Sequence, residues 1–149
     1  MKIIRTDSDN VDFQILVKEL DKDLAIRDGD EHAFFAQFNK IDAIKHVVVL
    51  YVDATAVACG AIKHYDEGII EIKRMYCKPE LRGKGYASMI LTELESWAKE
   101  LGYSTSILET GYKQPEAIRL YEKNSFKRIP NYGQYVGVDS SVCFEKRLD

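Results

Sequence analysis

The stretch IIEIKRMYCKPELRGKGYA, residues 69–87, organises the rest of the chain. Residues 69–77 mix isoleucines with polar residues, which suits a strand, and Pro79 cannot continue a ladder of strand hydrogen bonds. From Ala87 onward, apolar residues recur at helical spacing as far as Leu101, and Gly102 supplies a C-terminal stop. The sequence therefore predicts a strand, a glycine loop and a long amphipathic helix, in that order.

The glycine loop has the features of an anion site. The first N–H groups of a helix lack partners within it, the helix dipole is positive there, and glycine lets the backbone approach phosphate oxygens. Arg82 and Lys84 add positive charge beside Gly83 and Gly85. A plain strand-to-helix turn also needs glycine, so the loop alone leaves a structural turn and a phosphate site equally open.

The spacing R-x-x-G-x-A at residues 82–87 differs from both the dinucleotide fingerprint and the P-loop. It resembles the R/Q-x-x-G-x-G/A motif of the GNAT superfamily of N-acetyltransferases, which wraps the pyrophosphate of acetyl-coenzyme A. Residues 75–87 resemble that superfamily's core motif almost throughout. Residues 114–126 are similar to a second family motif, N-x-x-A-x-x-L-Y-x-x-x-G-F, with Gln114 in place of asparagine and Ser125 in place of glycine. Ser125 therefore predicts a strained or differently shaped turn.

Composition places the chain among soluble globular proteins, with 46% hydrophobic and 30% charged residues. Its 149 residues suit one domain, which we expect over residues 1–149. A net charge of -3 and a pI near 5.7 argue against nucleic acid or an anionic membrane as the partner. The cysteines lack metal-ligand spacing, and no apolar run is long enough for a membrane span. We expect a cytoplasmic protein without a metal or a membrane segment.

The remaining segments predict the order of the elements. Besides 69–77, we expect strands at 2–5, 46–52, 55–65, 104–110, 126–129 and 142–147. We expect a first helix that is capped by Asp7, Ser8 or Asp9, a second over 87–101, and a last one that begins near Gln114 and Pro115. Short turns make residues 46–77 an antiparallel meander, and the helix after residue 87 makes strands 69–77 and 104–110 parallel neighbours.

Residues 26–40 are harder to assign. Phe34, Phe35 and Phe38 suit a short helix or an ordered loop, interpreted either as a second packed helix or as a substrate lid. The predicted fold class is α/β (α+β), with a mixed central sheet of about six or seven strands flanked by about four helices. This order of elements resembles the whole GNAT fold.

The resemblance implies an N-acetyltransferase that uses acetyl-coenzyme A. It implies that the acetyl group is transferred to a primary amine of a small molecule or peptide, by direct attack in a ternary complex and without a metal. It is also compatible with a homodimer. Met75 matches a bulged strand position whose N–H lies near the thioester carbonyl, and the strand edge through Tyr76 and Cys77 follows the pantetheine arm. The loop residues that would hold the cofactor are Arg82, Gly83, Lys84, Gly85, Tyr86 and Ala87.

Tyr121 matches the general acid that protonates the leaving thiolate in this family. Helical periodicity alone makes it an ordinary core tyrosine, so both interpretations are carried forward. With ordinary pKa values of about 10 for tyrosine and about 8.5 for a thiol, the proton transfer is uphill by only about 2 kcal/mol.

Glu71 matches a strand carboxylate that deprotonates the amine, through water, in some family members. Strand alternation, apart from any bulge, puts Glu71 on one face with Lys73, Met75 and Cys77. A solvated ion pair with Lys73 is the competing interpretation. Glu109, at the C-terminal end of the parallel strand, is the rival base.

Residues 26–38 and 131–137 would flank the amine pocket, with Tyr132 and Tyr135 as its walls. Two other functional classes stay open. A non-catalytic acyl-coenzyme A binding or regulatory domain would release no coenzyme A with any amine. A small nucleotide-phosphate binder would be stabilised against heat by ATP and not by acetyl-coenzyme A.

Overall fold

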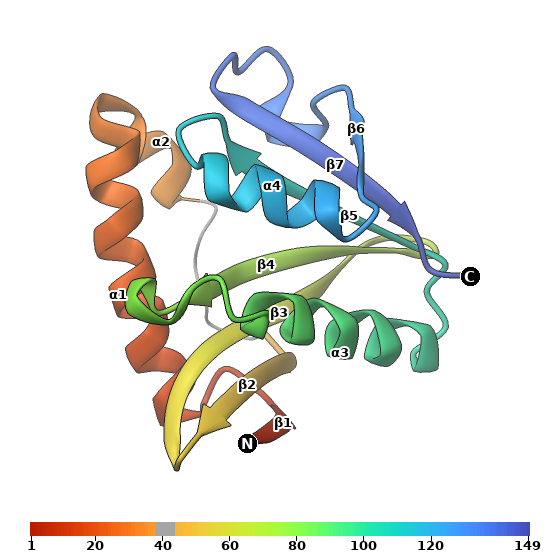
Figure 1. Ribbon diagram of the computed structural model, residues 1–149. Coiled ribbons are helices and arrows are strands. Elements are labelled where there is room, and N and C mark those ends of the chain that lie inside the picture. Colours follow the sequence, from red (N-terminus) through yellow and green to blue (C-terminus); the bar gives the residue numbers. More distant parts are fainter. Residues whose placement is uncertain (38–43) are drawn as a thin grey trace.

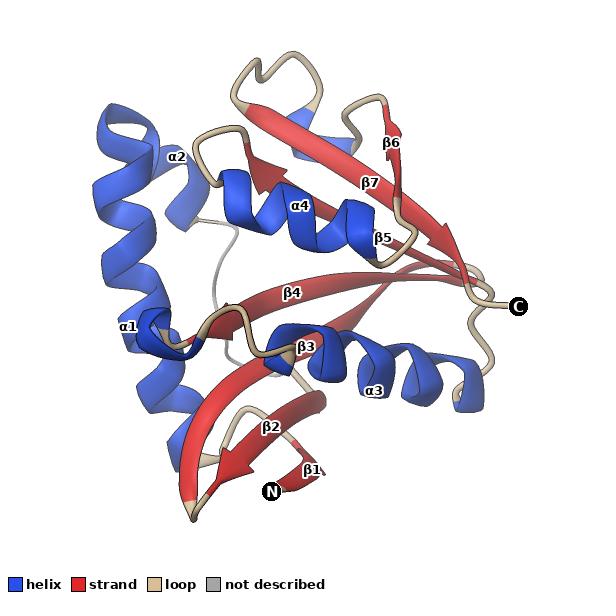
Figure 2. Ribbon diagram, viewed as in Figure 1, coloured by secondary structure: helices blue, strands red, loops and turns tan. Residues whose placement is uncertain are grey.

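The computed structural model describes residues 1–37 and 44–149, which form a mixed sheet with helices on both faces (Figure 1). The strands in this part of the chain are β1 (Lys2–Thr6), β2 (His46–Val52), β3 (Thr55–Asp66), β4 (Ile69–Cys77), β5 (Thr105–Gly111), β6 (Lys127–Ile129) and β7 (Ser141–Arg147). The helices there are α1 (Val11–Asp28), α2 (His32–Ala36), α3 (Tyr86–Glu100) and α4 (Pro115–Lys123), with 3-10 turns η1 (Gly29–Glu31), η2 (Pro79–Leu81) and η3 (Gly133–Tyr135) (Figure 2). The predicted fold class is confirmed.

The sheet has the strand order β1-β2-β3-β4-β5-β7-β6. β2, β3 and β4 form the predicted antiparallel meander, and β4 and β5 form the predicted parallel pair. This parallel pairing covers only three positions, the last of which joins Glu71 to Ile107. Beyond that point the two strands diverge in Figure 1, and their separation opens the sheet toward α1 and α4.

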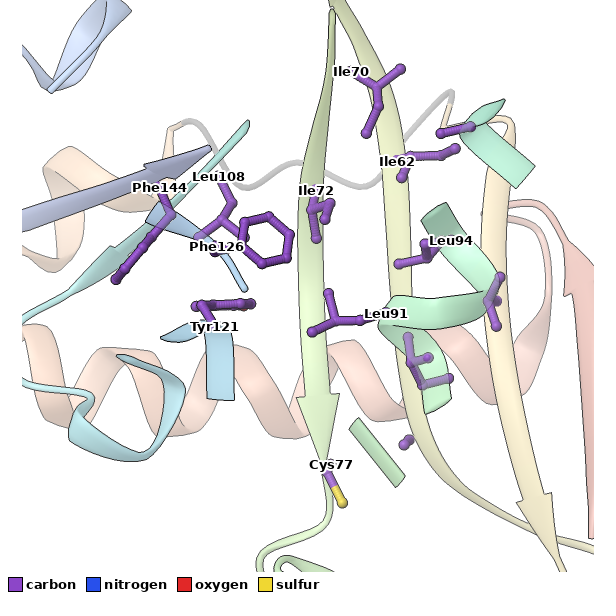
Figure 3. Packing of buried hydrophobic residues seen from close by; sticks show 14 of the residues in the cluster. Ile62, Ile70, Ile72, Cys77, Leu91, Leu94, Leu108, Tyr121, Phe126 and Phe144 are labelled. Atoms are coloured by element: carbon purple, nitrogen blue, oxygen red, sulfur yellow. The ribbon is translucent and has the colours of Figure 1, made fainter. Parts of the chain in front are cut away.

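Alternating side chains divide the core between the two faces of the sheet. Val48 and Leu50 of β2 pack on the face covered by α3 and α4, whereas Val47 and Val49 pack against α1. On the first face, Figure 3 shows Tyr121 and Phe126 on one side of β4 and Leu91 on the other. The diverging strands are therefore supported by separate helices.

A bulge at Arg74 breaks the alternation along β4. Arg74 has φ of 59°, and the pairing with β3 shifts between Ala61–Lys73 and Cys59–Tyr76. The extra residue moves Met75 and Cys77 onto the face of the α3 core, together with Ile70 and Ile72. The expectation that Glu71, Met75 and Cys77 share a face is therefore wrong beyond the bulge.

The N-terminal helix begins at a cap other than those predicted. Its cap is Asn10, whose side chain accepts a hydrogen bond of 2.8 Å from the Phe13 N–H, and not Asp7, Ser8 or Asp9. The helix continues to Asp28, where Gly29 ends it with φ of 55°.

The segment after α1 forms the packed helix of the two alternatives. α2 buries Phe35 against Tyr135 and Cys143. Phe38 lies outside the described residues. The turn after α4 holds Ser125 at φ of 70°, so the strained turn predicted there is confirmed. None of the helices within residues 1–37 and 44–149 has the length and apolarity that a bilayer span requires.

Candidate active site

The opening between β4 and β5 contains two adjoining cavities. The first, here called the loop cavity, has a volume of about 560 Å³ and is lined by the end of β4, the glycine loop and α4. The second, the inner cavity, has a volume of about 100 Å³ and lies among α1, α2, β4 and β5. The residues that line both are Leu20, Met75, Gln114, Ala117 and Tyr121. The two cavities therefore meet at Met75 and Tyr121.

The predicted cofactor residues gather around the loop cavity. Its lining includes Met75, Tyr76, Cys77, Arg82, Gly83, Gly85, Tyr86 and Ala87. Lys84 was also predicted, but it is exposed and does not line the cavity. Sequence reasoning missed the α4 side of this cavity, where Glu116, Arg119 and Lys123 contribute charged side chains.

The glycine loop fits a phosphate group. Gly83 and Gly85 both have φ of 85°, and a Cβ atom added at either would meet nothing within 4 Å, so open space lies in front of the backbone. Gly85 is the N-cap of α3, and no side chain of the described residues caps this helix. The first N–H groups of α3 are thus left for an external acceptor.

Arg82 fastens this loop to its surroundings. Its Nε donates a hydrogen bond of 3.0 Å to the Cys77 carbonyl, and its Nη1 lies 3.8 Å from Glu116 Oε1. Arg27 of α1 also pairs with Glu116. The guanidinium of Arg82 therefore orients the loop as well as supplying charge.

Glu71 lines the inner cavity with its carboxylate already in contact with two groups. The Tyr132 hydroxyl donates a hydrogen bond to Glu71 Oε2, and Lys73 Nζ lies 3.9 Å from Oε1. The pair with Lys73 exists, but the side chains are only 10% and 11% exposed, so it is a buried pair. Burial lowers the pKa of Lys73, and the charges of Glu71 and Glu109 oppose that shift.

Glu109 faces the same cavity from β5. The Ser141 hydroxyl donates a hydrogen bond of 2.7 Å to its Oε2. Burial raises the pKa of Glu109 to about 7. The hydrogen bond from Ser141 and the positive charge of Lys73 oppose this shift, and the negative charges of Asp28 and Glu71 reinforce it. A carboxyl group that titrates near neutral pH has the basicity that proton abstraction from an amine requires.

Tyr121 is both a core residue and a cavity residue. Its ring lies 5.7 Å from that of Phe126 and 5.9 Å from that of Phe144, and Figure 3 shows the three rings on the same side of β4. Burial, reinforced by the charge of Glu109, raises the pKa of Tyr121 above its usual value of 10. The hydroxyl is therefore protonated at neutral pH, and its proton transfer to a thiolate is uphill by more than the 2 kcal/mol or so expected from ordinary pKa values.

Comparison with known proteins identifies the family. The sequence model of the acetyltransferase (GNAT) family matches residues 13–126. The chain belongs to the GNAT acetyltransferase family. An IAA acetyltransferase from Azospirillum brasilense is 38% identical to it over 95 residues, which are 63% of this chain and 62% of the relative. The chain thus spans less than two thirds of that relative's length.

Solved structures show the same GNAT architecture. One, classed as an acyl-CoA N-acyltransferase from Klebsiella pneumoniae, is 29% identical, with a TM-score of 0.81 over 99% of this chain and 97% of that one. A second is a PaiA N-acetyltransferase from Thermoplasma acidophilum in complex with coenzyme A. It is 18% identical, with a TM-score of 0.71 over 99% of each chain, a similarity that shows the fold alone.

The sequence predicted some residues of the inner cavity and missed others. Tyr135 lines the inner cavity as expected. Tyr132 does not line it, but its hydroxyl donates a hydrogen bond to Glu71, which does. The sequence reasoning missed Asp28, although Leu20, Leu24 and Asp28 follow a helical i, i+4, i+8 spacing that could have placed them together. No group of three or more His, Cys, Asp or Glu side chains in residues 1–37 and 44–149 is arranged to hold a metal ion.

Proposed function

We propose that this chain transfers an acetyl group from acetyl-coenzyme A to a primary amine of a small molecule or peptide, by direct attack in a ternary complex. One observation carries the proposal. Tyr121 and Met75 line both the loop cavity and the inner cavity, and the inner cavity also holds the carboxylates of Glu71 and Glu109. An acid and a bulged strand residue thus lie where a donor site meets an acceptor site with two candidate bases.

The loop cavity suits the acyl donor. The backbone N–H groups at Gly85 and the start of α3 would bind the pyrophosphate, with Arg82 adding positive charge. The register of β4 with β5 ends at Glu71, so the edge of β4 from Met75 to Cys77 is open to the amide groups of a pantetheine arm. When bound, acetyl-coenzyme A supplies the activated thioester.

The residues of the chain would move two protons. As the amine nitrogen attacks the carbonyl carbon and the C–S bond breaks, the Tyr121 hydroxyl donates its proton to the thiolate sulfur. Glu71 or Glu109 accepts the proton that leaves the amine. The N–H of Met75 is the donor we assign to the carbonyl oxygen, because the bulge at Arg74 reorients the strand there.

A coenzyme A release assay across a panel of amines tests the proposal. We expect thiol release that requires both acetyl-coenzyme A and a primary amine, and one acetylated amine for each thiol released. The alternative is a non-catalytic acyl-coenzyme A binding domain, which would bind the donor in calorimetry and release no thiol with any amine. Stabilisation by ATP and not by acetyl-coenzyme A would favour a nucleotide-phosphate binder.

Three broader predictions accompany this function. We propose that residues 1–149 form a single N-acetyltransferase domain and that the protein works in the cytoplasm. A homodimer stays a prediction, which sedimentation of the purified protein tests directly.

A further inference from the structure

Asp28 is a buried carboxylate in the inner cavity that has no partner among residues 1–37 and 44–149. It ends α1 and is 8% exposed, and within the described residues its side chain makes neither a hydrogen bond nor an ion pair. Glu71 and Glu109, by contrast, both accept hydrogen bonds from side-chain hydroxyls. A carboxylate on a largely buried residue that accepts no hydrogen bond is stabilised by a cation that supplies the missing charge.

The negative charge around Asp28 is not fully neutralised, so the site would attract a cation. Burial raises its pKa, while His32 and Lys113 oppose that shift and Glu31 and Asp23 add to it. The Lys113 ammonium lies 3.8 Å from Glu31, so its charge is shared. The C-terminus of α1 adds partial negative charge at the same place.

The inner cavity as a whole also has more negative than positive side chains in its lining. Asp28, Glu71 and Glu109 line it, and Lys73 is the cation beside them. Arg74 also lines it, but that guanidinium pairs with Asp21 on α1 and its side chain is 1% exposed. The Arg74 Nε is buried and has no hydrogen-bond partner among the described residues, so it is out of reach of a carboxylate on the acceptor.

The path between the reacting centre and Asp28 is apolar on the side formed by α1 and α2. Leu20 lines both cavities, and Leu24 and Asp28 follow it on the same face of α1. With a rise of about 1.5 Å per residue, Asp28 lies about 12 Å further along the helix than Leu20. Phe35 of α2 adds a further apolar side chain to the lining.

We propose that Asp28 binds a second ammonium group on the acceptor, which makes aliphatic diamines the substrate class of this enzyme. One amine is acetylated beside Tyr121, the methylene chain lies along Leu24, and the other amine pairs with Asp28. This inference rests on the proposed function, since it names the acceptor of the same site. Acceptors that carry a carboxylate at the far end are disfavoured, because they bring like charges together.

The test compares acceptors of equal length that differ in their far end. These are 1,4-diaminobutane, 1-aminobutane and 4-aminobutanoate, with the five-carbon and eight-carbon diamines and monoamines as further pairs, because the longer chains reach further along the path of about 12 Å between Leu20 and Asp28. We expect kcat/KM for the diamine to exceed that for the monoamine by about 10- to 100-fold, the range of a hydrogen bond to a charged group. The aminobutanoate should be a poorer acceptor than the monoamine.

Asp28→Asn keeps the shape of the side chain and removes its charge. It should reduce the ratio of diamine to monoamine kcat/KM to about 1, and leave kcat/KM for the monoamine within about twofold. Asp30→Asn is the matched control, because Asp30 is exposed and lies two residues away. That variant should keep the wild-type ratio.

Binding without turnover gives an independent measurement. 1,4-Diaminobutane alone should raise the melting temperature of the wild type and of Asp30→Asn, and not that of Asp28→Asn. Equal kcat/KM for diamine and monoamine in the wild type, or a diamine preference that survives in Asp28→Asn, would overturn the inference. Failure to acetylate any amine would instead refute the proposed function, and the melting temperatures would still decide whether Asp28 binds the diamine.

Discussion

Replacing Gly60 by alanine should disturb the bulge that shapes the site. Gly60 lies on β3, opposite the shifted register at Arg74. A Cβ atom added there would lie 2.5 Å from Met75 Sδ, 2.7 Å from Ile90 Cγ2 and 2.9 Å from Leu94 Cδ1. These separations are well below the normal contact of about 3.5–4.0 Å between non-bonded atoms. Position 60 therefore needs glycine because of the space that Met75 and α3 occupy.

The cost follows from this crowding. Extra methyl groups in a packed core typically cost about 1–3 kcal/mol, and three simultaneous close contacts place Gly60→Ala at about 2–3 kcal/mol. For a chain of this size, that loss corresponds to a fall in melting temperature of about 4–12 °C. Because Met75 lines both cavities, its displacement should also lower kcat.

Urea denaturation and steady-state kinetics measure the two effects. Gly111→Ala is the matched control, since a Cβ atom there would first meet Gln114 Nε2 at an ordinary 3.6 Å. We expect its stability to stay within about 0.5 kcal/mol of the wild type. If Gly60→Ala were as stable as Gly111→Ala, the packing described between Met75 and α3 would be wrong.

The remaining predictions concern the loop, the base and the strained turn. Gly85→Asp should sharply weaken the binding of acetyl-coenzyme A, because it places a carboxylate where we propose a phosphate; unchanged affinity in calorimetry, with the mutant folded, would remove the loop from the donor site. If Glu109 is the base, wild-type kcat/KM should rise as the pH passes about 7, where this carboxyl loses its proton. In that case Glu109→Gln should abolish the rise in kcat/KM, and Glu71→Gln should keep it. If Glu71 is the base instead, the kcat/KM of Glu71→Gln should be most impaired at low pH. Ser125→Gly should stabilise the protein by about 0.5–1 kcal/mol in urea, because glycine adopts a φ of 70° without strain, and a loss of stability would contradict this explanation.

Much of the fold could be predicted because local signals agreed with the tertiary structure. The strand at residues 69–77 has the predicted bounds, since a hairpin turn at Gly68 precedes it and Pro79 follows it closely. The parallel pairing of β4 with β5 followed from the helix between them. The predicted cap of α1 was wrong, because Asp7, Ser8, Asp9 and Asn10 are all capping residues in succession and the sequence does not distinguish them.

The features that no local pattern reveals depend on contacts between distant segments. The bulge beside Met75 was expected only through the family resemblance, because it is coupled to the absent side chain of Gly60 and to α3. The pKa of Glu109 depends on burial by neighbouring elements, and the isolation of Asp28 depends on which side chains fail to reach it. Tyr121 became a candidate only through the motif around it, because its periodicity predicts a core residue, and it does lie in the core.

The kcat of Tyr121→Phe is the most direct test of the proposed transfer chemistry. The substitution removes one oxygen and keeps the ring packed between Phe126 and Phe144, so it separates proton donation from the stability of α4. We predict that kcat falls by about 10- to 1000-fold, while the affinity for acetyl-coenzyme A, measured by calorimetry, is unchanged. A wild-type kcat in the folded variant would show that Tyr121 is structural and that another group protonates the thiolate.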